Sequence, residues 1–337
     1  MGNRRRHGQH WTTGNPFVLS NGKLHPAFAA WWQPVKHMAA AEPFAGQGDL
    51  CRHLPSAKWQ SLYDIRPQDL GPGLPAVKRR DILNNPPKRL PPVVITNPPW
   101  LSAASAARRG MVVDMHEQTN LAWTATATIL SLTKYAAIVL PASFLTSAFF
   151  WKVRHRLTDI IELDSDVFAR TTQPACLALF VPAPSAPTKA KSLVIWRGAR
   201  RVGTYSHLAR MAGLRAMRDI TIVFNCPDGQ IGLVGLDGED QKRIRFVQAR
   251  AIRRLGVKPT SRHSTRIKLH KRLTKHELRR LLDLANRVLA SYRLRTCDVL
   301  LPASHSRRKD GKYRRRLPFY IARLILSAAA KEIGLTG

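Results

Sequence analysis

This chain of 337 residues has few of the features that mark several common classes of protein. It contains no Gly-Lys-Ser or Gly-Lys-Thr tripeptide, which excludes a P-loop. Its four cysteines are far apart, with no Cys-x-x-Cys pair and no histidine at zinc spacing, so reduced thiols are expected rather than a metal site or a disulfide framework. The almost uncharged residues 121–151 are interrupted by Lys134 and Pro141, which favours a buried helix and strand over a membrane span. The basic N-terminus lacks the apolar segment of a secretory signal, so we expect a cytoplasmic protein with no membrane partner.

Acidic residues are also few, because 21 Asp and Glu stand against 55 Lys and Arg and give a formal net charge of +34. Long-range attraction to a polyanion is the most direct interpretation, so nucleic acid is the expected partner, with double-stranded DNA favoured. Residues 241–337 alone hold 27 Lys and Arg but 5 Asp and Glu, which makes this part the expected docking surface. Charge does not distinguish DNA from RNA, and both stay open, as does the oligomeric state. The side chains expected to bind phosphates are Arg262, Arg266, Lys268, Arg307, Arg308, Lys309, Lys312, Arg314, Arg315 and Arg316.

The most informative stretch is Asn97-Pro98-Pro99-Trp100, which follows directly on the β-branched run Val93–Thr96. Proline cannot donate to a sheet and restricts the residue before it, so this pattern predicts a buried strand that ends at a sheet edge. In open α/β sheets, ligands bind outside the carboxyl ends of the strands. An amide, a rigid turn and an aromatic ring are therefore expected at a ligand site.

The chain upstream contains a second motif. A short apolar strand that begins at Ala39-Ala40-Ala41 leads into Gly46-Gln47-Gly48 and then a helical stretch, a pattern that brings backbone close to a nucleotide-like cofactor. The third glycine of the dinucleotide fingerprint is missing. Asp64 lies 16 residues beyond Gly48, near the end of the next expected strand, where a carboxylate is placed to accept from both hydroxyls of a ribose. Asp81, in a short third element at 81–83, is a candidate acceptor for an adenine amino group.

Strands alternate with helices as far as about residue 181, which predicts a doubly wound, Rossmann-like α/β sheet of seven strands. Residues 182–188 read as a proline-rich linker. A capping box at Thr274–Glu277 and a second helical pattern at 319–331 follow in a smaller basic α+β domain. The expected organisation is a basic flexible segment over 1–23, a catalytic domain over 24–199 and a nucleic-acid-binding domain over 200–337.

Taken together, the two motifs and their order resemble S-adenosylmethionine-dependent DNA adenine-N6 methyltransferases. The group in question has its cofactor motif before the Asn-Pro-Pro-aromatic motif and its target-recognition region at the C-terminus. The resemblance covers roughly residues 24–183, and its specific part is the tetrapeptide at 97–100. Beyond residue 200 it extends only to position and charge.

The resemblance implies S-adenosylmethionine as the cofactor, with Glu42, Phe44, Gly46 and Gly48 at its methionine end. It implies that Asp64 holds the ribose and Asp81 the cofactor adenine. Asn97, Pro98, Pro99 and Trp100 are then the catalytic motif, which accepts the hydrogens of the target amine while the ring of Trp100 stacks on a base flipped out of the duplex. Trp is less usual than Tyr or Phe in the last place.

Two alternatives stay open. The same chemistry on adenine in RNA is one of them, and a glutamine amide of a protein is a weaker variant because it requires no strongly basic C-terminal region. The other is a non-catalytic nucleic-acid-binding protein that retains a degenerate methyltransferase fold. No convincing nuclease motif is found in residues 200–337.

Overall fold

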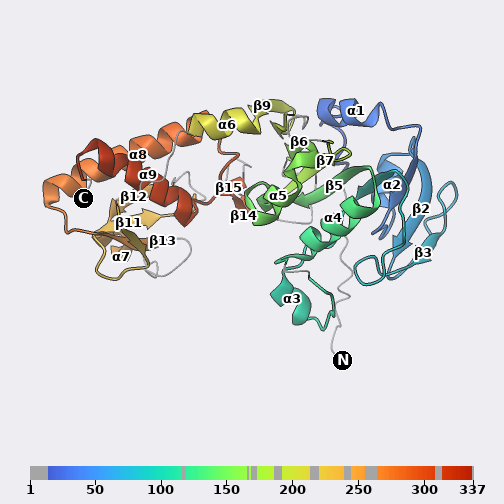
Figure 1. Ribbon diagram of the computed structural model, residues 1–337, viewed down its shortest axis with the longest axis horizontal. Coiled ribbons are helices and arrows are strands. Elements are labelled where there is room, and N and C mark those ends of the chain that lie inside the picture. Colours follow the sequence, from blue (N-terminus) through green and yellow to red (C-terminus); the bar gives the residue numbers. More distant parts are fainter. Residues whose placement is uncertain are drawn as a thin grey trace. The chain divides into compact units, whose positions relative to one another are not determined.

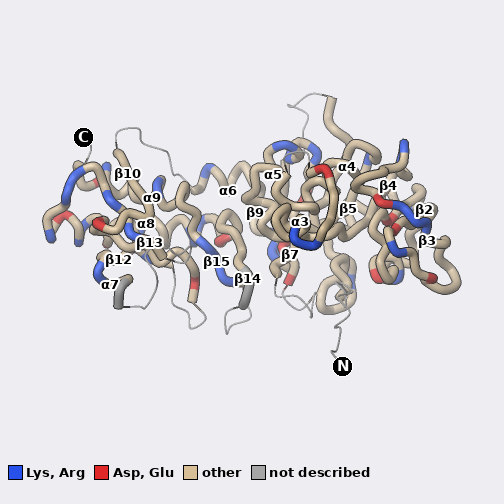
Figure 2. The backbone as a smooth tube through the Cα atoms, turned by 90° about the horizontal axis from the view of Figure 1, so that it is seen from below, with Lys and Arg blue, Asp and Glu red and all other residues tan. Residues whose placement is uncertain are grey.

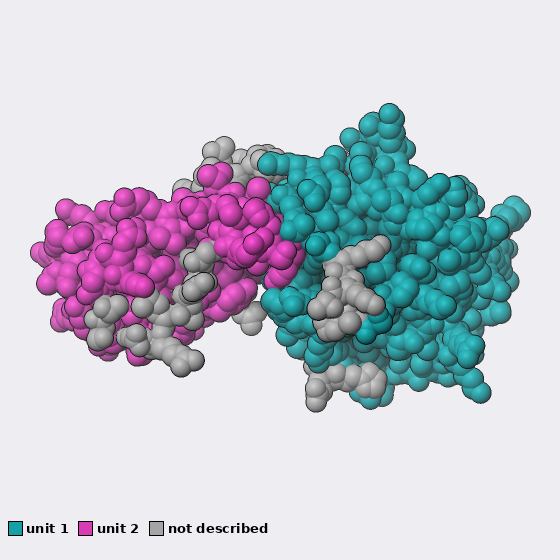
Figure 3. All heavy atoms as spheres, turned by 45° about the horizontal axis from the view of Figure 1, so that its top comes forward, with its two compact units in different colours: residues 1–204 teal, residues 205–337 magenta. Residues whose placement is uncertain are grey.

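The computed structural model describes residues 14–115, 118–164, 167, 173–185, 192–212, 220–238, 244–254, 264–307 and 313–335. The chain divides into two compact units, residues 1–204 and residues 205–337, which Figure 3 shows in two colours. No described helix is long and apolar enough to cross a membrane.

The first unit is built on a sheet of nine strands in the order β3-β2-β1-β4-β5-β7-β6-β8-β9 (Figure 1). Neighbouring strands from β3 to β5 are parallel, β7 runs antiparallel to both β5 and β6, and β8 is parallel to β6. The expected doubly wound α/β fold is therefore confirmed, with nine strands in place of the seven that were expected. The strands are β1 (Ala39–Glu42), β2 (Lys58–Asp64), β3 (Val77–Arg79), β4 (Val93–Thr96), β5 (Tyr135–Pro141), β6 (Leu157–Glu162), β7 (Ala175–Phe180), β8 (Val194–Arg197) and β9 (Arg200–Thr204).

Short helices connect these strands, and their bounds follow from local capping. Asn120 accepts from the backbone N–H of Ala122 and starts the longest of them. The helices are α1 (Pro26–Trp32), α2 (Asp49–His53), α3 (Ala103–Ala107), α4 (Leu121–Leu132) and α5 (Ala148–Val153), with 3-10 turns at Ala142–Thr146 and Arg154–Arg156. The strands β4, β5 and β7 are buried along their whole length apart from the first residue of β5, as expected for a sheet covered on both faces.

The two edges of this sheet are short and basic. β3 ends one side with the exposed Lys78 and Arg79, and β9 ends the other with the exposed Arg200 and Arg201. Because β9 pairs with β8, the sheet continues past residue 199, where the catalytic domain was expected to end.

Part of the segment expected to be flexible is packed. Residues 1–13 lie outside the described chain, but Phe17 is fully buried and stacks on Phe28 of α1 with ring centroids 4.6 Å apart. Val18 also forms a bridge with Leu24. Within the segment 1–23 that was expected to be flexible, Phe17 and Val18 are thus in contact with the domain.

The second unit combines a four-stranded antiparallel sheet, ordered β10-β13-β11-β12, with two long helices that pack on each other. The Thr274 hydroxyl accepts from the N–H of Glu277 and the Glu277 carboxylate accepts from that of Thr274, so the expected capping box is confirmed. One apolar core joins sheet and helices. The elements are α6 (Tyr205–Ala212), β10 (Ile222–Phe224), β11 (Ile231–Val234), β12 (Arg245–Gln248), α7 (Ala249–Arg254), β13 (Ser264–Leu269), α8 (Lys275–Arg295), β14 (Ala303–Arg307), β15 (Tyr313–Arg315) and α9 (Phe319–Glu332).

A buried ion pair connects α8 to the hairpin formed by β14 and β15. Asp237 is 1% exposed and accepts two hydrogen bonds from the Arg293 guanidinium, at 2.8 and 2.9 Å. Its carboxylate also accepts from the backbone N–H groups of Ile244 and Arg315. Arg293 in turn donates to Asp298 at 2.7 Å. The hydrogen bonds and the Arg293 charge outweigh the effect of burial and lower the pKa of Asp237.

Candidate active site

A cavity of about 440 Å³ opens at the carboxyl ends of β1, β2 and β4. These strands are parallel, so the residues at their ends meet at one edge of the sheet. Glu42, Asp64 and Asn97 are those residues, and all three line the cavity. Of the residues singled out from the sequence, the cavity lining contains Glu42, Phe44, Gly46, Asp64, Asp81, Asn97, Pro98 and Pro99.

The Gly-x-Gly turn shapes the floor of this cavity. Gly46 and Gly48 adopt φ values of 51° and 79°, in the left-handed region that favours glycine. The backbone N–H of Gly46 donates to the Asp64 carboxylate at 2.9 Å, so the turn is tied to the end of β2. Gly48 starts α2, and a Cβ there would lie 2.8 Å from a methyl of Leu70. Gly46 thus belongs to the cavity lining, whereas Gly48 acts behind it through packing.

The Asp64 carboxylate is held in place by two backbone hydrogen bonds and keeps free acceptor positions on both oxygens. One oxygen accepts from Gly46 N–H and the other from Arg66 N–H at 2.8 Å. A carboxylate has about four acceptor positions, so each oxygen keeps one for a ligand hydroxyl.

Asp81 lies in a turn that follows β3. The short third element expected at 81–83 is therefore not a strand, and the third strand is Val77–Arg79. The Oδ1 of Asp81 accepts from the backbone N–H groups of Leu83 at 3.0 Å and Asn84 at 3.2 Å, which closes the turn. Its Oδ2 accepts from the Asn84 side-chain amide at 2.9 Å. The same amide nitrogen donates to the carbonyl of Val112 at 2.9 Å, so Asp81 also helps to hold the segment that follows α3.

Glu42 is 1% exposed, and burial raises the pKa of its carboxyl to about 8. Hydrogen bonds from the Thr96 hydroxyl and from the backbone N–H of Phe44, at 2.9 Å, oppose this shift without cancelling it. The carboxyl is therefore mainly protonated at pH 7, and β1 and β4 are joined through it at the cavity wall.

The raised pKa of Glu42 predicts that the first unit loses stability as the pH rises. Between the ordinary value of 4.5 and about 8 the folded chain holds a proton that the unfolded chain has released, so the free energy of unfolding falls through this window. Glu42→Gln removes the titration, and its free energy of unfolding should depend less on pH. Urea unfolding from pH 4 to 9 measures this, with the exposed Glu332→Gln as control; parallel profiles for Glu42→Gln and the unsubstituted protein would contradict the prediction.

Asn97 follows β4 and lines the cavity, and its side chain carries a buried acceptor. Its side-chain oxygen Oδ1 is buried and has no hydrogen-bond partner among the described residues. An unpaired buried amide oxygen costs free energy, so such a group at a cavity wall indicates a ligand donor. Pro98, buried, and Pro99 continue the chain along the lining and restrict its backbone.

Trp100 does not take the position expected of a stacking platform. Its side chain is 7% exposed, and its indole N–H donates to the Val139 carbonyl of β5 at 3.3 Å. Trp100 is absent from the described cavity lining, and the hydrogen bond to Val139 gives its indole N–H a partner inside the domain. Phe44 is the aromatic side chain that the described cavity lining contains.

The expected phosphate-binding residues divide into three groups. Arg262, Arg308, Lys309 and Lys312 lie outside the described residues, and of Arg307 only the backbone is described. Lys268 is exposed and pairs with Asp228 at 2.7 Å, while Arg266 donates to the Pro227 carbonyl at 2.6 Å and Arg316 is half-buried.

Arg314 and Arg315 serve the interior of the second unit. Arg314 donates to the Asp237 carbonyl, and Arg315 is 5% exposed and donates to the Leu301 carbonyl at 3.2 Å. The expectation that Arg315 contacts a phosphate is therefore wrong for this structure, because its guanidinium is buried.

The sequence argument did not include the exposed face of α8. Its apolar residues pack into the core, whereas five basic side chains along the helix are exposed; Figure 2 marks the Lys and Arg positions on the chain. The signal was available in the alternation of basic residues with the buried leucines. These side chains are Lys275, Arg279, Arg280, Arg287 and Arg295.

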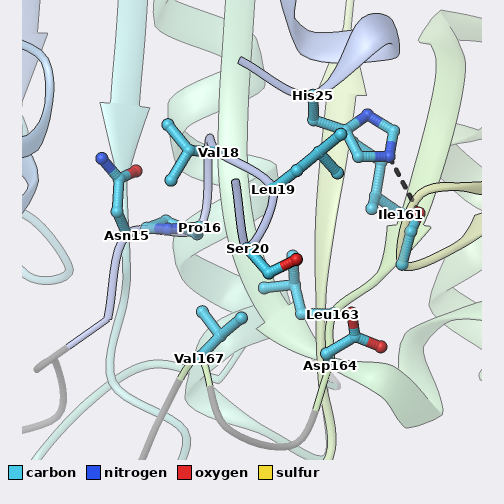
Figure 4. A pocket seen from close by; sticks show the side chains of 11 residues that line it. Asn15, Pro16, Val18, Leu19, Ser20, His25, Ile161, Leu163, Asp164 and Val167 are labelled. Carbon is cyan, nitrogen blue, oxygen red and sulfur yellow. Dashed lines mark hydrogen bonds between the residues drawn. The ribbon is translucent and has the colours of Figure 1, made fainter. Parts of the chain in front are cut away.

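A smaller cavity of about 150 Å³ lies near the ends of β6 and β8 (Figure 4). The ring of His25 is 2.9 Å from the Gly198 carbonyl through Nε2, and its Nδ1 accepts from the N–H of Ala27. This arrangement fits a neutral ring with its proton on Nε2, and burial lowers the pKa of His25 accordingly. Nδ1 is occupied in starting α1 and Nε2 in bonding the Gly198 carbonyl, so we assign this histidine a structural role.

No protein-family model matches the chain, and no curated protein matches it by sequence. Solved structures with a similar fold include the M protein of the type I restriction enzyme EcoKI, at 16% identity and a TM-score of 0.39 over 56% of this chain and 49% of that one. A class I S-adenosylmethionine-dependent methyltransferase from Listeria monocytogenes has 15% identity and a TM-score of 0.36, over 53% of this chain and 67% of that one. The type I restriction-modification methyltransferase subunit from Streptococcus thermophilus has 12% identity and a TM-score of 0.37, over 55% of this chain and 49% of that one. The chain thus spans about half of the length of the two restriction-modification proteins, and at these identities the likeness concerns the fold.

Proposed function

We propose that this chain is an S-adenosylmethionine-dependent methyltransferase that methylates the exocyclic N6 of adenine in DNA. The observation that carries the proposal is the unpartnered, buried Oδ1 of Asn97 at a cavity formed by the carboxyl ends of β1, β2 and β4. An acceptor in that position is suited to a donor on a ligand, and an exocyclic amine is such a donor.

The cavity fits the proposed cofactor in size and in donor and acceptor groups. Its volume of about 440 Å³ lies within the range of small-molecule sites. Asp64 offers free acceptor positions to a diol, and Asp81 offers a carboxylate to an adenine amino group. When bound there, S-adenosylmethionine supplies a methyl group that its sulfonium makes electrophilic. Glu42 and Phe44 would line its methionine end.

The residues around Asn97 act on the target base by positioning it. Asn97 Oδ1 accepts one hydrogen of the amine, and the Pro98 carbonyl is proposed to accept the other, which localises the nitrogen lone pair. Fixed acceptors aimed at a developing positive charge are electrostatic preorganisation, and holding the amine still contributes proximity. Since Trp100 is buried, Phe44 and the rigid Pro98-Pro99 surface replace it in our proposal as the contacts for the base faces.

We expect Asp64→Ala to weaken cofactor binding by about tenfold or more, because hydrogen bonds to a charged group are worth about 1.5–3 kcal/mol. Asp64→Asn retains one acceptor oxygen and should fall between Asp64→Ala and the unsubstituted protein. Isothermal titration with S-adenosylmethionine measures both. An unchanged Kd in Asp64→Ala would remove this residue from the ribose site.

Nucleic acid as substrate is supported by the charge of the chain. The formal net charge is +34, and α8 adds five exposed basic side chains to Lys268 as described phosphate-binding candidates. Phosphate contacts of this kind bind all sequences alike, so they favour a nucleic-acid substrate without fixing its recognition sequence.

The experiment that tests the proposal is incubation of unmethylated DNA and, separately, RNA with S-adenosylmethionine, followed by mass spectrometry of the nucleosides. N6-methyldeoxyadenosine is the expected product. A methylated adenosine from RNA alone would move the substrate to RNA, and methylation of cytosine would change the base. No product together with no measurable affinity for S-adenosylmethionine would favour a non-catalytic nucleic-acid-binding protein.

A further inference from the structure

Two consecutive arginines follow α3, on the segment that runs from the Asn97–Trp100 motif over the cavity. Arg108 and Arg109 are both exposed, and Arg109 lines the cavity whereas Arg108 is absent from its described lining. The two side chains have the same charge and differ by one position, so their surroundings decide what each can bind.

The backbone at Arg109 is fixed by the end of α3. Gly110 adopts a φ of 67°, and the N–H of Met111 donates back to the Ala106 carbonyl at 3.1 Å, which ends the helix in a left-handed turn. The side chain of Asn84 then holds the Val112 carbonyl at 2.9 Å. Arg109 is thus the last side chain before a turn that is anchored on both sides.

The two guanidinium groups are engaged differently. Arg108 donates through Nε to the Ala104 carbonyl and through Nη2 to the Ser105 hydroxyl, both at 3.3 Å, so its charge is folded back on its own helix. The guanidinium of Arg109 has no hydrogen-bond or ionic partner among the described residues. A cation at the cavity rim thus keeps all five of its donors available to a ligand.

We propose that Arg109 binds a phosphate of the substrate strand next to the target nucleotide, an inference that rests on the proposed function. A base turned out of the duplex rotates about its backbone, so the phosphates beside it come to the rim of the cavity that receives the base. A planar guanidinium matches two phosphate oxygens at once. Through this contact Arg109 positions the strand at the site of transfer, independently of the basic surface of the second unit.

The test compares Arg109→Gln with Arg108→Gln in the full chain, using a duplex oligonucleotide whose target adenine faces a mismatch and is therefore easily flipped. We expect Arg109→Gln to weaken oligonucleotide binding about tenfold. The negative slope of log K against log salt should become shallower by about 0.9, the value for one phosphate contact. Arg108→Gln should match the unsubstituted protein in both measurements. Arg109→Lys retains the charge and should keep the slope while losing part of the affinity.

Titration with S-adenosylmethionine completes the test, because the carboxylate of the cofactor is the other anion within the proposed site. An unchanged cofactor Kd in Arg109→Gln supports the phosphate contact. Weaker cofactor binding with an unchanged salt slope would overturn it, and so would equal slopes in Arg109→Gln and Arg108→Gln. The salt dependence needs no turnover. A protein that binds DNA but yields no methylated nucleoside would therefore contradict the proposed enzyme, while the two salt slopes would still support or overturn the role of Arg109.

Discussion

Asn97→Ala is expected to reduce the rate of methyl transfer strongly while leaving the affinity for S-adenosylmethionine within about twofold. The substitution removes the buried Oδ1 that the described residues leave unpartnered, and with it the acceptor proposed to orient the target amine. Removing one preorganised hydrogen-bonding group from an active site typically lowers the rate by about 10²–10³-fold. Single-turnover transfer to a duplex oligonucleotide, with cofactor in excess, measures the effect on the chemical step.

Asn85→Ala provides the matched control, since Asn85 is an exposed asparagine of the same unit that is absent from the described cavity lining. It should transfer methyl groups at the unsubstituted rate. Two results would contradict the role of Asn97: a rate in Asn97→Ala within threefold of the control, or a loss that is explained by weaker cofactor binding.

Asp237→Ala should cause the largest loss of stability, and the loss should be confined to the second unit. The substitution leaves the half-buried Arg293 without one of its two carboxylate partners and leaves the N–H groups of Ile244 and Arg315 without an acceptor. Breaking a buried ion pair by removing one partner costs about 3–5 kcal/mol.

The distribution of tryptophan makes this prediction easy to localise. All eight tryptophans precede residue 205, so their emission reports on the first unit, whereas circular dichroism also reports on α8 and α9. Urea unfolding of Asp237→Ala should shift the dichroism transition and leave the tryptophan transition in place. Asp228→Ala removes the exposed partner of Lys268 and should change neither; a dichroism midpoint in Asp237→Ala equal to that of this control would refute the prediction.

The parts of the site that could be predicted from the sequence are those fixed by local pattern. The run Val93–Thr96 and the prolines after it predict a strand that ends at Asn97, and the glycines after Glu42 predict the tight turn. Since parallel strands end at one edge, the positions of Glu42, Asp64 and Asn97 along their strands were enough to bring them together.

The errors arose where a side chain has its partner far away in the sequence. Trp100 is directed into the core by the carbonyl of Val139, and the hydrogen bonds of Asp237 with Arg315 cross 78 positions. Such contacts leave no periodic signal, so a basic triplet reads as an exposed surface even when its middle residue is buried. The error at Asp81 has a local cause instead. An aspartate that accepts from the backbone N–H groups two and three residues later favours a turn over a strand.

The basic pairs at the two edges of the large sheet bear on how the protein behaves at high concentration. An uncovered edge strand offers unpaired N–H and C=O groups to any other chain, and regular pairing between edges is a common route to aggregation. Here Lys78 and Arg79 occupy one edge and Arg200 and Arg201 the other, on strands of three and five residues. Joining any two edges of neighbouring molecules would bring four positive charges together along a short ladder. Polyanions or high salt would weaken that repulsion, so the protein is best concentrated at low ionic strength and before nucleic acid is added.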